Sequence, residues 1–285
     1  MHPTVQHAAR SVASGATGAA DPPLPPGQQS LFADQPSVEA AVPGDELRAL
    51  AERLPRGLRL GTSSWAFAGW AGLVYRGPVE QTVLAREGLR AYANHPLFAT
   101  VSIDRSYYQP LDPSVYRGYA ESVPAHFRFM VKAHADLTTP WLRKAGTRQP
   151  NRRLLDLEHA MRFVVEPALE GLGAGPSGHL GVLLFQFPPL SGPILSQPQR
   201  FRDRVETFLA GLPVGPPYAV EIRNRELAEP DWYTMLGRHG VMPCVSVHPM
   251  MPDLIDQARR VLTGDSTLPV AVRWNLTPGF DYESA

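Results

Sequence analysis

Short apolar runs recur along most of the chain, and polar or helix-patterned stretches separate them. The runs are rich in β-branched and aromatic residues, which is typical of buried strands. We therefore predict seven strands, at Leu58–Thr62, Ala99–Ile103, Phe127–Val131, Leu180–Phe185, Tyr218–Ile222, Val241–Val247 and Pro269–Trp274.

Most of the intervals between these runs carry apolar residues at helical spacing. The first helix is predicted from Asp45 to Leu54, before Pro55 and Gly57. Asp112 is a good N-cap, and Pro113 follows it at the first helical position. Further helical patterns follow Val79, cover 151–169 with an end at Gly171, and recur at 201–209, 232–236 and 254–262.

Strands that alternate with helices predict a parallel sheet, because each return to the same edge needs a crossover. The runs are apolar on both faces, as a covered parallel sheet requires. We predict an α/β fold, a TIM-like β/α barrel with seven visible units. A closed barrel of this kind has eight, so the eighth unit is apparently missing. The rival is an open, doubly wound sheet.

Residues 1–44 differ in composition from the rest, with much Ala, Gly, Pro and Gln and few large apolar side chains. Such a stretch cannot bury enough apolar area to offset its ordering entropy. We expect a disordered tail over 1–44 and a barrel domain over 45–285.

Charge and cysteine content narrow the classes of function. The chain of 285 residues has 27 basic and 27 acidic side chains, so no global basic field exists, although a local basic site remains open. The one cysteine, Cys244, has apolar neighbours and is expected to be a buried, inert thiol. No apolar run approaches the roughly 20 residues of a membrane helix, and no secretory signal is evident. We expect a cytoplasmic protein that does not contact membranes.

In a β/α barrel the residues after each strand converge on one mouth. Cationic side chains outnumber acidic ones there, so the mouth should attract anions. We take Glu221, Asp104 and Lys132 as candidate catalytic residues. Candidate ligand-binding residues are Arg223, Arg273, Asn275, Gln186, Tyr107, Tyr108, Trp65 and His134. Two alternatives stay open: Glu221 and Arg223 form a structural ion pair, and the aromatic residues pack in the core or rim.

Metal ligation receives little support from the sequence. The only plausible ligands are His134, His248, Asp104 and Glu221, which come from separate strands without a recognised spacing. No glycine-rich phosphate loop opens a helix, because Gly171–Gly175 ends one. We therefore predict no metal and no cofactor.

Six ordered blocks carry a resemblance to a known family: GTSSW at 61–65, VSIDRSYY at 101–108, FRFMVKAH at 127–134, LLFQFPP at 183–189, VEIRNREL at 220–227 and VAVRWNL at 270–276. Together they resemble the YecE-like family, domain of unknown function 72, over about 58–276. The resemblance implies a β/α barrel but no agreed reaction. Where many members have Glu and Asn in strand two, this chain has Ser102 and Asp104, and Asn275 replaces a common His. The resemblance also implies an eighth strand, for which we find no counterpart.

The tail contains one motif, QQSLF at Gln28–Phe32, which resembles the pentapeptide that docks bacterial proteins on the DNA sliding clamp. A disordered tail can place Leu31 and Phe32 in an apolar pocket while Gln28 hydrogen-bonds at its rim. The alternative is that Leu31 and Phe32 fold back onto the barrel.

Three hypotheses about function follow. The first is an enzyme-like pocket for a small anionic ligand, clamped by Lys132, Arg223 and Arg273 with Glu221 or Asp104 as base. The second is a single-stranded nucleic-acid binder in DNA maintenance, recruited by the tail motif, with aromatic side chains stacking on bases. The third is a non-catalytic scaffold.

Overall fold

A computed structural model of the chain describes residues 38–144, 146–262 and 268–274. Its main sheet has seven strands, in the order β1-β2-β3-β6-β7-β8-β9, and every neighbouring pair is parallel. All seven predicted strands are confirmed, at β1 Leu60–Thr62, β2 Phe98–Ile103, β3 Arg128–Lys132, β6 Leu180–Gln186, β7 Tyr218–Glu221, β8 Met242–Ser246 and β9 Ala271–Arg273.

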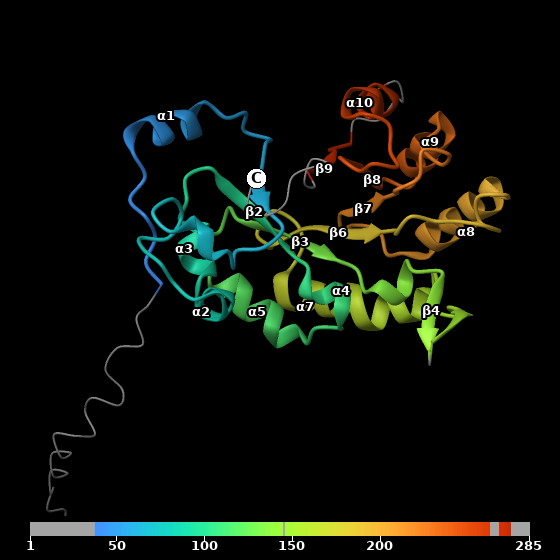
Figure 1. Cartoon of the computed structure of the whole chain (residues 1–285), viewed down its shortest axis with the longest axis horizontal. Coiled ribbons are helices and arrows are strands. Elements are labelled where there is room, and N and C mark those ends of the chain that lie inside the picture. Colours follow the sequence, from blue (N-terminus) through green and yellow to red (C-terminus); the bar gives the residue numbers. More distant parts are fainter. Residues whose placement is uncertain (1–37, 145, 263–267, 275–285) are drawn as a thin grey trace, which may run out of the picture. The chain divides into compact units, whose positions relative to one another are not determined.

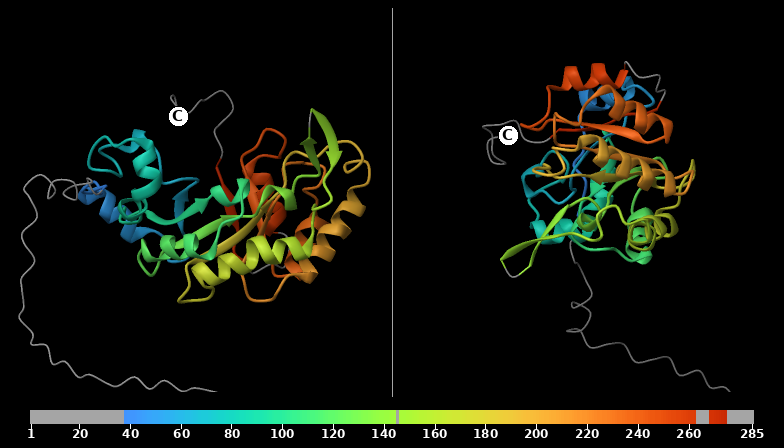
Figure 2. Two further views of the ribbon diagram at one scale, coloured as in Figure 1. Left: turned by 90° about the horizontal axis from the view of Figure 1, so that it is seen from below. Right: turned by 90° about the vertical axis from the view of Figure 1, so that its right-hand side faces the viewer.

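The strands of this sheet follow one another in sequence order without a reversal (Figure 1). A doubly wound sheet reverses its order at a switch point and is covered by helices on both faces. Here the order never reverses, and the sheet curls with helices against its outer face (Figure 2). The rival open doubly wound sheet is therefore wrong.

Helices occupy most of the intervals where apolar spacing predicted them. Asp112 caps α5 as expected, because its side chain accepts a hydrogen bond from the Ser114 amide. The helices are α1 Asp45–Arg53, α2 Gln81–Glu87, α3 Leu89–Ala93, α4 Arg105–Tyr108, α5 Pro113–Glu121, α6 Leu157–Ala160, α7 Glu166–Leu172, α8 Pro198–Gly211, α9 Pro230–Arg238 and α10 Leu254–Leu262.

The predicted helix over 151–169 was placed too early. It begins only after Asp156, whose side chain accepts from the His159 amide, and it contains a π-helical turn at Met161–Val165. Leu155 precedes the cap with a left-handed backbone (φ 59°), which no helix continues. The helix also ends later than Gly171, at Leu172, where Gly173 takes a positive φ of 67°.

Two further features were not predicted. The strands β4 Trp141–Lys144 and β5 Thr147–Pro150 form a separate antiparallel hairpin between β3 and α6. Residues 38–41 belong to the stretch expected to be disordered, yet their backbone pairs with 74–76, as in the bond from the Arg76 amide to the Glu39 carbonyl. Residues 1–37 lie outside the described residues.

Two apolar layers cover the two faces of the sheet. The larger layer lies between the outer face and the helices, and it contains Ile103, Val131 and Phe185 from the strands with Leu84 and Trp232 from the helices. The smaller layer lies on the inner face and consists of Val182, Leu184, Ala219 and Cys244. Successive side chains along each strand thus alternate between the outer face, where they contact the helices, and the inner face.

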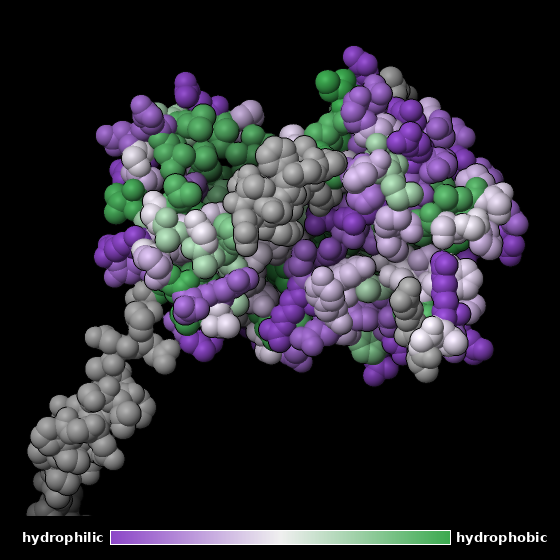
Figure 3. Space-filling model, in the orientation of Figure 1, coloured by the Kyte–Doolittle hydropathy of each residue, from purple (hydrophilic) through white to green (hydrophobic). Residues whose placement is uncertain are grey.

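The strands at the two ends of the order are poorly covered. On β1, Leu60 is 37% exposed, and on β9, Val272 is 47% exposed. Figure 3 shows hydrophobic surface beside α1. Within the described residues no ladder joins β1 to β9, and no eighth parallel strand is present.

No helix of the described chain combines the length and the apolar character that crossing a bilayer requires.

The outer layer should dominate the stability of the fold. Leu84 is fully buried on α2, so Leu84→Ala should lower the free energy of unfolding by about 2–5 kcal/mol through lost burial and a cavity. Leu73→Ala is the matched control, because Leu73 is 66% exposed, and its effect should stay within about 0.5 kcal/mol. Urea denaturation measures both, and equal effects would contradict this assignment of the core.

Candidate functional site

Polar side chains replace apolar ones on the inner face at the carboxyl ends of the strands. Ser102 on β2, Lys132 on β3, Gln186 on β6, Glu221 on β7 and Arg273 on β9 share this edge. The strand register aligns Gln186 with Glu221 across neighbouring strands. Because the strands are parallel and in register, their carboxyl ends lie side by side. The side chains at these ends therefore come together in one place.

Glu221 is the centre of this group and is fully buried. Its Oε1 accepts from Nε of Arg223 at 2.8 Å, and its Oε2 accepts from Nη1 of Arg273 at 2.7 Å. Nη1 of Arg273 also donates to Oε1 of Gln186 at 2.5 Å. Both carboxylate oxygens therefore have cationic donors, which compensates the cost of burying the charge. The ion pair between Glu221 and Arg223, which the sequence left as an alternative, is present, and Arg273 is its third member.

Lys132 lies beside this network with fewer partners. Its Nζ is 3.6 Å from Oδ2 of Asp104 and lies 4.6 Å from the centroid of the Tyr107 ring. Within the described chain, no acceptor comes to hydrogen-bonding distance of this ammonium. Ser102 holds Asp104 in place, because its Oγ donates to Oδ1 of Asp104 at 2.5 Å. The two strand-two positions that depart from the YecE-like pattern are thus bonded to each other.

The charges of the group act on one another. Burial lowers the pKa of Lys132. The negative charges of Asp104 and Glu221 act against this shift, whereas the positive charges of Arg273 and Arg223 add to it. Burial also disfavours the charge of Arg273, but the Glu221 carboxylate outweighs it and raises the pKa of Arg273.

Cys244 lies on the inner face beside Glu221. Burial raises the pKa of its thiol well above the usual value, and the Glu221 carboxylate raises this pKa further. Cys244 is buried, as its apolar neighbours in the sequence predicted.

The remaining predicted residues have different surroundings. Trp65 packs in the outer layer, where its ring meets Tyr119 edge-on and its Nε1 donates to the Ala85 carbonyl. Tyr108 is 77% exposed and touches Tyr107 edge-on. His134 follows β3 and is half-buried. Asn275, Gln28, Leu31 and Phe32 lie outside the described residues.

A second polar group, whose residues follow β3 in the chain, was not predicted from the sequence. His134, Asp136 and His159 bring one nitrogen or oxygen each to within 4.8 Å of one another. His134 and Asp136 are two residues apart in one turn, but His159 comes from α6 and no spacing links it to them. Burial lowers the pKa of His159, and the nearby Arg153 lowers it further.

A cavity of about 530 Å³ lies elsewhere, and none of its residues is among the candidate catalytic or ligand-binding residues, although Arg225 follows the fifth predicted strand. Four of its side chains are acidic and two are basic, so it suits an anion less well than the mouth does. It is lined by Arg225, Glu226, Glu229, Met251, Pro252, Asp253, Asp256 and Arg260.

Comparisons with known proteins identify relatives of this chain. A family model described as "Protein of unknown function DUF72" matches residues 59–283. No curated protein matches the chain significantly. A DUF72 family protein of Enterococcus faecalis V583 is similar in structure, with a TM-score of 0.45 and 17% identity over 80% of this chain and 74% of that one. A DUF72 family protein of Thermotoga maritima MSB8 has a TM-score of 0.41 and 22% identity over 67% of this chain and 65% of that one.

Glu221 should be essential to the stability of the strand ends. Glu221→Gln removes the charge that compensates Arg223 and Arg273, so it should lower the free energy of unfolding by about 3–5 kcal/mol. Glu170→Gln is the control, because Glu170 pairs with Arg117 on the surface and should contribute at most about 1 kcal/mol. Urea denaturation compares the two variants. A cost below about 1 kcal/mol for Glu221→Gln would show that this carboxylate does not hold the guanidinium groups together.

Proposed function

We propose that this chain, which belongs to the DUF72 family of proteins of unknown function, binds a small phosphorylated or carboxylated molecule at the carboxyl ends of its parallel strands. The observation that carries the proposal is the pairing of Arg223 and Arg273 with the buried Glu221, with Lys132 beside Asp104 at the end of β3. The charges of Arg223, Arg273 and Glu221 all act on the pKa of Lys132.

The frame of this site is, in our proposal, a TIM-like β/α barrel. The support is the sequential order of seven parallel strands with helices against the outer face. In such barrels, ligands bind at the carboxyl ends of the strands, where the side chains of several strands converge. The polar group of this chain lies at that end.

The charge balance of the group favours an anion. Lys132, Arg223 and Arg273 contribute three positive charges, whereas Glu221 and Asp104 contribute two negative ones, which leaves an excess of one. The side chains of Arg223 and Arg273 are 19% and 12% exposed. Within the described residues, their other guanidinium nitrogens form no hydrogen bond and can meet a carboxylate or phosphate, whose geometry suits a guanidinium fork.

The two candidate carboxylates have different capacities for chemistry. Both oxygens of Glu221 are bonded to guanidinium groups, so Glu221 suits the role of a positioning residue for Arg223 and Arg273. Asp104 is 32% exposed on its side chain and lies near Lys132, so in our proposal it is the base that a bound ligand meets. Lys132 remains the proposed partner of the ligand anion.

A second candidate function rests on exposed aromatic side chains. Tyr108 is 77% exposed and Trp274, directly after β9, is 75% exposed. Such rings can stack on the bases of single-stranded nucleic acid, while the cations hold phosphates. The sliding-clamp motif at Gln28–Phe32 belongs to this alternative and remains a prediction from the sequence.

Inorganic phosphate tests the first function. In a titration at constant ionic strength, phosphate should raise the melting temperature of the wild-type chain in a saturable way, because a ligand of the folded state stabilises it. Lys132→Met and Arg223→Gln should each abolish most of the rise. Arg238→Gln is the matched control, since Arg238 forms a surface ion pair with Glu206 and should leave the rise unchanged. The same titration with succinate separates a carboxylate site from a phosphate site.

Two outcomes would reject the proposal. One is a melting temperature that neither phosphate nor succinate changes, and the other is an equal rise in all variants. Salt-dependent binding of a single-stranded oligonucleotide that phosphate cannot displace, and that Trp274→Ala weakens, would favour the nucleic-acid alternative instead.

A further inference from the structure

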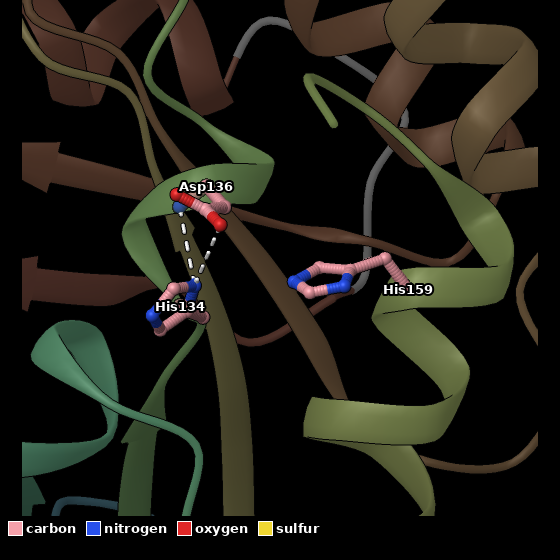
Figure 4. Close-up of side chains that lie close together, drawn as sticks. All are labelled: His134, Asp136 and His159. Carbon is pink, nitrogen blue, oxygen red and sulfur yellow. Dashed lines mark hydrogen bonds and ion pairs between the residues drawn. The ribbon is translucent and has the colours of Figure 1, made fainter. Parts of the chain in front are cut away.

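We propose that His134, Asp136 and His159 form a binding site for a divalent transition-metal ion, with zinc the best match. The three side chains each direct one possible ligand atom toward a common point, and these atoms lie within 4.8 Å of one another (Figure 4). The site is separate from the Glu221 network, and the proposal does not depend on anion binding there.

His159 provides the observation that points to a missing partner. Its side chain is buried, with 7% of the residue exposed, and its Nε2 has no hydrogen-bond partner within the described chain. A buried nitrogen without a partner is unfavourable, because it has lost water and gained nothing in return. Figure 4 shows the His159 ring directed toward His134 and Asp136. A metal ion between the three side chains would satisfy this nitrogen.

The other two ligands come from the turn that follows β3. His134 is the N-cap of a short 3-10 helix, Ala135–Leu137, and its Nδ1 accepts weakly from the Asp136 amide at 3.3 Å. The lone pair of Nδ1 therefore points to the side where Asp136 lies. Oδ2 of Asp136 is 3.8 Å from this nitrogen. The lone pair of Nδ1 is engaged only by this weak bond, which a metal ion would replace. An imidazole nitrogen and a nearby carboxylate are ligand types that zinc uses.

Arg153 competes with a metal for Asp136, but only in part. Its Nη1 is 3.3 Å from Oδ2 of Asp136, and its side chain is 57% exposed. This contact resembles the outer hydrogen bonds that orient ligating carboxylates in metalloproteins. Arg153 and His134 therefore approach the same oxygen, Oδ2, from different sides. A carboxylate oxygen has two lone pairs, so one can accept from Arg153 while the other is directed to the ion.

The chain around the site is held in place by unusual local structure. Asn151 is buried, and its Nδ2 donates to the carbonyl groups of Asp136 and Thr139, which ties the turn after β3 to the segment before α6. Leu155 has a left-handed backbone, and a π-helical turn begins two residues after His159. Strained residues and π-turns both gather at functional sites. Phe163 packs against the His159 ring at 4.7 Å and fixes its direction.

The ligand set indicates which metal would bind. Two imidazole nitrogens and one carboxylate oxygen are the protein ligands of several catalytic zinc sites, which keep a fourth position open. Ligand atoms around a tetrahedral zinc ion lie about 3.4 Å apart, so atoms now up to 4.8 Å apart must approach by at most about 1.4 Å on binding. Magnesium and calcium prefer sets made of oxygen alone, so they fit this site less well.

Metal titration of the purified, untagged full-length chain tests the site. After treatment with a chelator and dialysis, calorimetric titration with zinc chloride should show one ion bound per chain, together with a higher melting temperature. His159→Phe keeps a ring of similar shape and should weaken zinc binding by at least about 100-fold, since loss of an outer partner alone costs about 10- to 100-fold. Asp136→Asn should weaken it as well. Cobalt bound in place of zinc should give the visible absorption of a tetrahedral site.

His126→Ala is the control, because His126 is exposed and lies outside the cluster. It should bind zinc as the wild type does. Circular dichroism of each metal-free variant establishes that it folds, and Asp136→Asn gives an independent answer should His159→Phe unfold the chain. No stoichiometric zinc binding by the folded wild type, or unchanged binding in both ligand variants, would refute the site.

Discussion

A fully buried carboxylate, Glu221, joins the carboxyl ends of the strands in this protein. A charge in such a position is tolerated only when donors surround it, and here Arg223 and Arg273 supply them from the end of β7 and from β9. Gln186 on β6 completes the group through its bond to Arg273. Three of the strands, β6, β7 and β9, thus meet around one ionic network, which fixes the positions of Arg223 and Arg273.

The sequential strand order determines which side chains surround this ionic network. Because the order never reverses, the inner face receives only a small apolar layer, with Leu184 and Cys244 beside Glu221. The large layer on the outer face can therefore supply most of the stability, while the inner face carries polar side chains. Because side chains alternate along each strand, those that stabilise the fold lie on the outer face and those of the candidate site lie on the inner face.

Strand β3 links the two proposed sites. Lys132 ends this strand on the inner face, and His134 begins the turn that leads to Asp136. A cation of the anion site and a ligand of the metal site are therefore only two residues apart. The hairpin of β4 and β5, together with the segment anchored by Asn151, then returns the chain so that His159 meets this turn. The inserted hairpin, which no periodicity predicted, is thus part of the path that brings His159 to this turn.

The sequence alone determined the seven strands, the helix capped by Asp112 and the strand-end positions of Lys132, Glu221 and Arg273, because periodicity and capping are local properties of the chain. It also offered the ion pair between Glu221 and Arg223, which are two residues apart, as one of two alternatives. Only the tertiary structure decided that Arg273 shares Glu221, that Trp65 packs in the core, and that His159 faces His134 and Asp136. These contacts join residues distant in sequence, and their geometry depends on strand register, on a left-handed Leu155 and on a π-turn, none of which leaves a repeating pattern in the residues.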